Sequence, residues 1–173
     1  MKNSKTIALA GLTTALSLIF LVFGTYIETF DLSCLLLSSL IIMLPLSKQS
    51  VKTALLCYLA VSILSLIFTA SVGRFSVTIL YALLFGIYPI ALYFEKSKNI
   101  NIVLATIVKG IWFVSVCFLM YYALKFFVAT NSFIEKYIVY ILIFGGLIVF
   151  VIFDYMMKRF QKLTNIMVKK LNF

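Results

Sequence analysis

The spacing of the charged residues constrains the fold of this chain more than any other feature. Five uncharged stretches of 16 to 22 residues cover residues 6–27, 32–47, 53–73, 75–94 and 137–153, and a sixth over 99–124 is interrupted only by Lys109. A helix needs about 20 apolar residues to cross a bilayer core about 30 Å thick. The pattern therefore predicts six membrane-spanning helices.

The composition agrees with that prediction. Hydrophobic residues make up 64% of the chain and charged residues 12%, against about 45–50% and about 25% in soluble domains. We expect an all-α, polytopic integral membrane protein with a single domain over residues 1–173. The predicted spans are 6–26, 32–47, 53–70, 77–94, 103–124 and 137–157, followed by a tail over 158–173.

The basic residues predict the orientation of the chain. Cytoplasmic loops of membrane proteins are enriched in Lys and Arg. With the N-terminus inside, eleven basic residues fall on the cytoplasmic side and three, Arg74, Lys125 and Lys136, fall outside. We therefore expect both termini in the cytoplasm and the protein in the plasma membrane. Because topology explains the net charge of +10, we expect membrane lipid as a partner and no nucleic acid.

Two segments have a predictable shape. Pro89 follows Gly86 inside the fourth span, and a proline cannot donate a hydrogen bond to the preceding turn, so we expect a kink there. The tail is amphipathic, which predicts a helix lying in the cytoplasmic headgroup layer. Its apolar face holds Phe160, Leu163, Met167 and Leu171, and its basic face holds Lys158, Lys162 and Lys169.

Several chemistries are excluded by what the chain lacks. It has no histidine, which rules out histidine-based metal sites and triads, and no P-loop with which to use ATP itself. A proton-relay acid lies at mid-bilayer, whereas all five acids lie near predicted span ends, at Glu28, Asp31, Glu95, Glu135 and Asp154. We expect neither an enzyme nor a self-powered transporter, and no cofactor or metal.

The first span carries small residues on two faces. One face holds Thr6, Ala10, Thr13, Thr14 and Ser17, and the other holds Ala8, Gly11 and Ala15. Small residues four positions apart let two helix backbones approach closely. Gly11 and Ala15 therefore either pack against another helix of this bundle or contact a partner helix.

Polar, charged and aromatic residues gather in the predicted outer loops and at the outer helix ends. The candidate substrate-binding residues are Glu28, Asp31, Arg74, Ser115, Phe118, Tyr121, Tyr122, Lys125, Asn131, Glu135, Tyr137 and Tyr140. A small-molecule pocket combines an apolar and aromatic lining with a few placed polar groups. The alternative is an aromatic belt at the membrane interface, with solvated loop charges.

Lys109 is the one basic residue inside a predicted span. It lies seven residues past Ile102, and its long side chain can extend to the inner membrane surface. Alternatively it pairs with a partner subunit or with backbone carbonyls.

With these residues described, the chain resembles the membrane-embedded substrate-binding (S) subunits of energy-coupling-factor vitamin transporters. The resemblance rests on the length, the six predicted spans, the cytoplasmic termini and the segment KTIALAGLTTAL from Lys5 to Leu16. In that family, small residues four apart on the first helix contact a shared coupling subunit. This implies the same contact for Gly11 and Ala15, with Ala8 beside them. The family usually has alanine at both positions, so Gly11 departs from its motif.

The resemblance also implies a function. It implies a subunit that captures a small micronutrient at the outer face, through the outer residues named above. Uptake then relies on a transmembrane coupling subunit and two ATPase subunits, and the substrate is not specified. The alternative is a structural membrane protein that assembles others, such as a morphogenesis or division scaffold, without a small-molecule ligand. An enclosed outer cavity lined by the third outer loop and the fifth span would favour capture.

Overall fold

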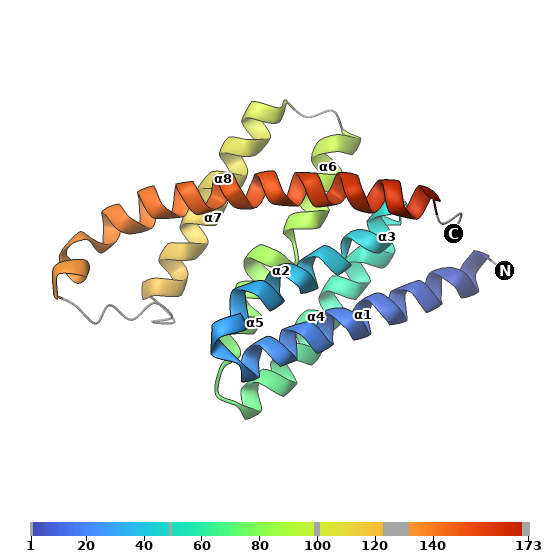
Figure 1. Ribbon diagram of the computed structural model, residues 1–173, viewed down its shortest axis with the longest axis horizontal. Helices are drawn as coiled ribbons and strands as arrows, with labels where there is room; N and C mark the ends of the chain where they lie inside the picture. Colours follow the sequence, from blue (N-terminus) through green and yellow to red (C-terminus); the bar gives the residue numbers. More distant parts are fainter. Residues whose placement is uncertain (1, 49, 99–100, 123–131, 171–173) are drawn as a thin grey trace. The chain divides into compact units, whose positions relative to one another are not determined.

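The computed structural model describes residues 2–48, 50–98, 101–122 and 132–170, and every regular element among them is a helix (Figure 1). The all-α prediction is confirmed for this part of the chain. The elements are α1 (Lys2–Tyr26), the 3₁₀ helix η1 (Glu28–Phe30), α2 (Asp31–Ile41), α3 (Met43–Ser47), α4 (Val51–Ser71), α5 (Phe75–Leu80), the π-helix η2 (Tyr81–Phe85), α6 (Tyr88–Ser97), α7 (Ile102–Tyr122) and α8 (Ser132–Lys170).

Five helical stretches are long and apolar enough to cross a membrane. They are Thr6–Tyr26, Val51–Ser71, Phe75–Ser97, Ile102–Tyr122 and Tyr137–Ile166, and the apolar stretch Asp31–Ser47 is shorter. Their outward side chains are strongly apolar: Ile63, Ile67 and Ile111 each expose more than 60% of their surface. Water would disfavour so much exposed apolar surface, whereas lipid does not. The protein is therefore membrane-embedded, and the count of six spans stays a prediction.

The chain divides into two compact units, which we describe separately. Unit 1 comprises residues 1–94 and 157–173, and unit 2 comprises residues 95–156. In unit 1, α1 lies against α2 and α4, and α4 also contacts α3 and α5 (Figure 1). The core between them is apolar, with Leu21, Leu35, Val61 and Val77 almost fully buried.

Small residues let α1 and α2 pack closely. The Ser17 hydroxyl donates to the Ser38 carbonyl at 3.0 Å, and the Ser38 hydroxyl donates to the Ser17 carbonyl at 2.9 Å. Seven residues after Ser17, a Cβ atom on Gly24 would lie 2.7 Å from the Cβ of Cys34 on α2. The close contact therefore requires glycine at position 24. Each serine hydroxyl is satisfied by a backbone carbonyl of the facing helix.

The helical path is interrupted where Gly86 and Pro89 predict a kink. Residues Tyr81–Phe85 form a π-helix, and the Gly86 N–H donates to the Tyr81 carbonyl five residues earlier, at 2.7 Å. The carbonyl of Ala82 consequently loses the bond that an α-helix would give it. The Tyr58 hydroxyl of α4 donates to this carbonyl at 3.0 Å.

Pro89 removes one helical hydrogen bond from a second backbone carbonyl. Because proline has no N–H, the Phe85 carbonyl four residues earlier receives no bond from it. The Ser39 hydroxyl of α2 donates to this carbonyl at 2.5 Å. Backbone groups at membrane depth must be satisfied within the protein, so the interruption is possible because α2 and α4 supply these two hydroxyls.

The last helix is longer than the sequence predicts. A span over 137–157 and a separate interfacial tail over 158–173 were expected, but α8 runs without a break from Ser132 to Lys170, 39 residues. At 1.5 Å per residue this is about 58 Å, almost twice the bilayer core of about 30 Å. The tail pattern marks a change of surface along one helix, because no glycine or proline separates it from the span.

Unit 2 contains the end of α6, all of α7 and most of α8. Aromatic rings join α7 to α8: the Phe113 ring lies 5.6 Å from that of Phe150 and 6.1 Å from that of Phe153, measured between centroids. All three side chains are buried. A Cβ atom on Gly110 would lie 3.3 Å from the Phe150 ring, so this glycine provides the space that the ring occupies.

Candidate functional site

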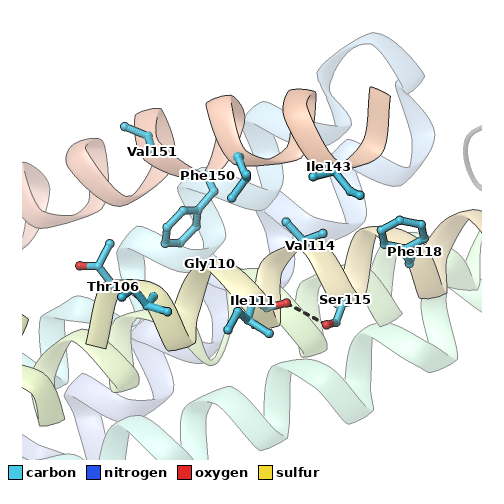
Figure 2. A pocket seen from close by; sticks show the side chains of 11 residues that line it. Thr106, Gly110, Ile111, Val114, Ser115, Phe118, Ile143, Phe150 and Val151 are labelled. Atoms are coloured by element: carbon cyan, nitrogen blue, oxygen red, sulfur yellow. Dashed lines mark hydrogen bonds between the residues drawn. The ribbon is translucent and has the colours of Figure 1, made fainter. Parts of the chain in front are cut away.

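Unit 2 contains an open groove between α7 and α8 that can hold a ligand (Figure 2). Its volume is about 590 Å³, within the range of about 300–1,000 Å³ that is usual for small-molecule pockets. The groove is lined by Thr106, Ile107, Gly110, Ile111, Val114, Ser115 and Phe118 of α7 and by Ile143, Leu147, Phe150 and Val151 of α8.

The lining of the groove is almost entirely apolar. It contains no charged side chain, and its only side-chain hydroxyls are those of Thr106 and Ser115. The Ser115 hydroxyl donates to the carbonyl of Ile111, one turn back on its own helix, at 2.8 Å (Figure 2). The hydroxyl oxygen can still accept a bond, but the groove offers a ligand mainly apolar contact.

The floor of the groove is set by the ring of Phe150. Figure 2 shows this ring reaching from α8 toward α7 beside Gly110. On the same helix as Gly110, Val114 lies opposite Gly146, where an added Cβ would sit 3.7 Å from the valine methyl group. Two glycines therefore keep the helices close at the floor, while larger side chains form the walls.

Aromatic side chains continue from one end of the groove along α7. The rings of Phe118 and Tyr122 are stacked, 6.1 Å apart and 3° from parallel, and Tyr121 meets Tyr122 edge-on at 4.9 Å. The sequence places Ser115, Phe118, Tyr121 and Tyr122 in one candidate site. The structure brings Ser115 and Phe118 into the groove, Tyr122 beside Phe118 and Tyr121 beside Tyr122.

Lys109 joins three helices in unit 2, which neither sequence-based alternative anticipates. Its ammonium nitrogen lies 2.6 Å from Glu95 Oε2 on α6 and 3.0 Å from Asp154 Oδ1 on α8. The three side chains expose only 10–11% of their surface. The expectations that Lys109 snorkels, or pairs with a partner subunit or with backbone carbonyls, did not include this arrangement: it pairs with two acids of its own chain. We call this the Lys109 cluster.

In unit 1, Asp31 and Arg74 of the predicted outer set bind each other. Arg74 Nη2 lies 2.5 Å from Asp31 Oδ2, and Arg74 Nη1 donates to the Thr25 carbonyl at 2.9 Å. Asp31 is the first residue of α2, where a negative charge is favoured by the helix dipole. Thr25 lies in the last turn of α1, so Arg74 ties together a helix end and a helix start.

The remaining predicted substrate residues fall into two groups. Tyr137 and Tyr140 lie on α8 with exposed side chains and do not line the groove. Glu28 and Glu135 lie in η1 and α8, but the description does not extend to their side chains, and Lys125 and Asn131 lie outside the described residues.

The two small-residue faces of α1 differ in burial. Thr13 and Ser17 are buried, so part of one face packs within unit 1. Ala8, Gly11 and Ala15 are exposed, and a Cβ atom on Gly11 would meet nothing within 4 Å. Unit 1 itself therefore leaves the face of Gly11 and Ala15 open.

The α8 side of the groove and the Lys109 cluster were not predicted from the sequence. The groove residues of α8, from Ile143 to Val151, look like ordinary membrane-facing residues in the sequence. A signal for the cluster existed, because a charged residue inside a span usually has a partner within the protein.

Within the described residues, no group of three or more Cys, Asp or Glu is arranged to hold a metal ion. Comparisons with protein families, with curated proteins and with solved structures found no match.

Proposed function

We propose that this chain is a membrane subunit that captures a small, mainly apolar micronutrient and depends on other subunits for its uptake. The observation that carries the proposal is the groove between α7 and α8. Its volume and lining suit a small ligand, and it includes Ser115 and Phe118 of the predicted substrate set. The groove is open, and it extends from Phe118 to Thr106 rather than staying in the outer half of α7.

The proposal includes a topology and a set of partners. The chain crosses the plasma membrane six times with both termini in the cytoplasm, which places eleven basic residues inside and three outside. A transmembrane coupling subunit binds the exposed face of Ala8, Gly11 and Ala15, and two ATPase subunits act through it. The open space beside Gly11 supports this contact, because small residues permit close helix approach.

A binding experiment tests the proposal. The purified full-length protein in detergent is titrated with a panel of water-soluble and lipid-soluble vitamins, and the shift of its thermal unfolding temperature is measured. We expect one class of compound to raise this temperature in the wild type and to have a much smaller effect on Leu147→Trp, which fills the groove. Failure of every compound to bind, together with failure to co-purify a coupling subunit, would overturn the proposal.

The alternative is a structural protein that assembles other membrane proteins. The exposed face of Gly11 and Ala15 favours this reading as much as it favours capture, because both need a partner helix. The two functions differ at the groove. An assembly protein retains its activity when Leu147→Trp fills the groove, whereas a capture subunit loses substrate binding.

A further inference from the structure

We infer that the core of unit 1 binds an internal water molecule at the hydroxyl of Tyr81. This site lies in unit 1 and the groove lies in unit 2, so the inference does not depend on the proposed function. It follows from the burial of Tyr81, from the polar side chains near its hydroxyl and from the bonds that those side chains already make.

Tyr81 places a polar group in the apolar core of unit 1. It begins the π-helix η2, and its side chain is fully buried. Its hydroxyl oxygen has no hydrogen-bond partner among the residues that the structure describes. A buried hydroxyl without a partner is costly, and buried polar groups are almost always paired with the protein or with ordered water. The Tyr81 hydroxyl therefore indicates a bound group that completes its hydrogen bonds.

Polar side chains of α2 and α4 lie near this hydroxyl. Ser38, Tyr58 and Cys57 influence it electrostatically, and Ser38 does so most strongly of the three. The Ser38 hydroxyl nevertheless does not meet Tyr81 Oη at hydrogen-bond geometry. The two tyrosine rings lie against the same glycine, because a Cβ atom on Gly86 would lie 2.6 Å from Tyr58 Cδ2 and 3.1 Å from Tyr81 Cε1. This packing restricts how far the Tyr81 side chain can move to find a partner.

The three neighbours have no hydrogen left to donate to Tyr81. Ser38, Tyr58 and Cys57 each donate to a backbone carbonyl, at 2.9, 3.0 and 3.5 Å. A hydroxyl or thiol has one hydrogen but also lone pairs that accept. These side chains can therefore only accept from a further group. The group that fits this site accepts the hydrogen of Tyr81 and donates hydrogens of its own.

Water has this combination of donors and acceptors. It can accept the hydrogen of Tyr81 and donate its two hydrogens to lone pairs of Ser38 and Cys57, and a buried water typically makes about three hydrogen bonds. A cation would also be attracted by lone pairs, but none of these side chains is charged, and an unpaired buried charge is costly. Ordered waters help to satisfy polar groups where a membrane-spanning helix is interrupted, as it is at η2.

Hydroxyl-radical labelling tests the inference directly. The full-length protein in lipid nanodiscs receives a short X-ray pulse, which converts water into hydroxyl radicals, and mass spectrometry measures the oxidation of each residue. A fully buried side chain is oxidised only if a water lies beside it. We expect Tyr81 to be oxidised, and we expect residue 81 of Tyr81→Phe to be oxidised at least about fivefold more slowly, because the water loses one of its few polar partners.

Thermal unfolding of the same variant supplies a second measurement. Tyr81→Phe keeps the ring and removes the hydroxyl. If the hydroxyl had no partner, its removal would raise the unfolding temperature, whereas the loss of a bond to water should lower this temperature by about 2–4 °C. The matched control is Tyr58→Phe, which removes a hydroxyl that donates to the Ala82 carbonyl and should lower the temperature in either case.

Each outcome decides for or against a bound water. Oxidation of Tyr81 in the wild type, together with a lower unfolding temperature for Tyr81→Phe, supports it. An unchanged or higher temperature for this variant would overturn it. A lower temperature without oxidation of Tyr81 would indicate a direct bond to Ser38 and would also overturn it. Stabilisation of the wild type by sodium over choline that Tyr81→Phe abolishes would indicate a cation instead of water.

Discussion

The two units hold their helices together in different ways. In unit 1 the polar contacts are many and dispersed: the paired hydroxyls of Ser17 and Ser38, the Ser39 and Tyr58 hydroxyls on freed carbonyls, and Arg74 at the helix ends. In unit 2 the polar contacts between helices that we describe are concentrated in the Lys109 cluster. Apolar contacts between the rings of Phe113, Phe150 and Phe153 also join α7 to α8.

Because of this difference, we expect unit 1 to tolerate the loss of one polar contact better than unit 2 does. When several weak contacts hold helices together, the loss of one leaves the others in place. When one cluster of charges holds three helices, removing its centre leaves buried acids without their ammonium group, and such a loss is costly. Because the polar contacts described in unit 2 are concentrated in the Lys109 cluster, none of them joins α7 to α8 along the groove. The surface of the groove is therefore available to a ligand.

The largest effect is expected at the centre of the Lys109 cluster. Lys109→Met removes the ammonium group from two carboxylates that are each about 10% exposed, so we expect the free energy of unfolding to fall by about 3–5 kcal/mol. Denaturant titration of the purified protein in detergent measures it. The triple variant Lys109→Met, Glu95→Gln, Asp154→Asn buries no charge and should recover most of the loss. A loss below 1 kcal/mol for the single variant would mean that unit 2 does not depend on the cluster.

A smaller effect is expected for the charged contact of unit 1. Arg74→Met removes the ion pair with Asp31 and the bond to the Thr25 carbonyl, and bonds to charged groups contribute about 1.5–3 kcal/mol. We expect a loss of about 2 kcal/mol in the same titration, because Arg74 is still 24% exposed. Arg74→Lys keeps the charge and should recover part of the stability. A loss as large as that of Lys109→Met would remove the contrast between the units.

A single hydroxyl of unit 1 should matter less again. Ser39→Ala removes the donor to the Phe85 carbonyl, which we expect to cost about 1–2 kcal/mol. The control is Ser62→Ala, because the Ser62 hydroxyl donates to a carbonyl of its own helix, that of Tyr58, at 2.8 Å. We expect the control to change stability by less than about 0.5 kcal/mol. Equal losses for both would mean that the Phe85 carbonyl does not depend on the Ser39 hydroxyl.

The smallest effect on folding is expected on the open face of α1. Gly11→Leu adds a side chain where nothing lies within 4 Å of the new Cβ, so the free energy of unfolding should change by less than about 0.5 kcal/mol. Co-purification of a coupling subunit should nevertheless be lost, because the two helices can no longer approach closely. The control Leu12→Ala alters a neighbouring exposed residue. If Gly11→Leu still co-purifies with a coupling subunit, the exposed face of α1 does not bind that subunit.

Features of the fold that depend only on residues close together in the sequence could be predicted. Uncharged stretches predict the long helices, because length and apolar character are local properties, and Pro89 predicts the interruption before α6 because the missing N–H belongs to the proline itself. The π-helix of Tyr81–Phe85 could not be predicted, since it depends on hydroxyls from α2 and α4. The continuation of α8 beyond the predicted span could not be seen in the sequence, because a change from apolar to basic residues marks a change of surface and not the end of a helix.

The candidate site was predicted in part for the same reason. Ser115 and Phe118 were identified from their place on the fifth span, and they line the groove. The partners of Lys109 lie 14 and 45 residues away from it in the sequence. The α8 wall of the groove is likewise distant in sequence from the α7 wall, and no local pattern connects them. Asp31 and Arg74 were predicted as substrate-binding residues from their charges, and the sequence has no local signal for the ion pair between these positions, which are 43 residues apart.

The hydrogen bond from the Ser39 hydroxyl to the Phe85 carbonyl couples two positions on different helices. Pro89 removes the N–H that would otherwise bind this carbonyl, so the cost of losing the Ser39 hydroxyl should be smaller in a protein in which residue 89 has an N–H. The effects of substitutions at positions 39 and 89 on stability should therefore not add.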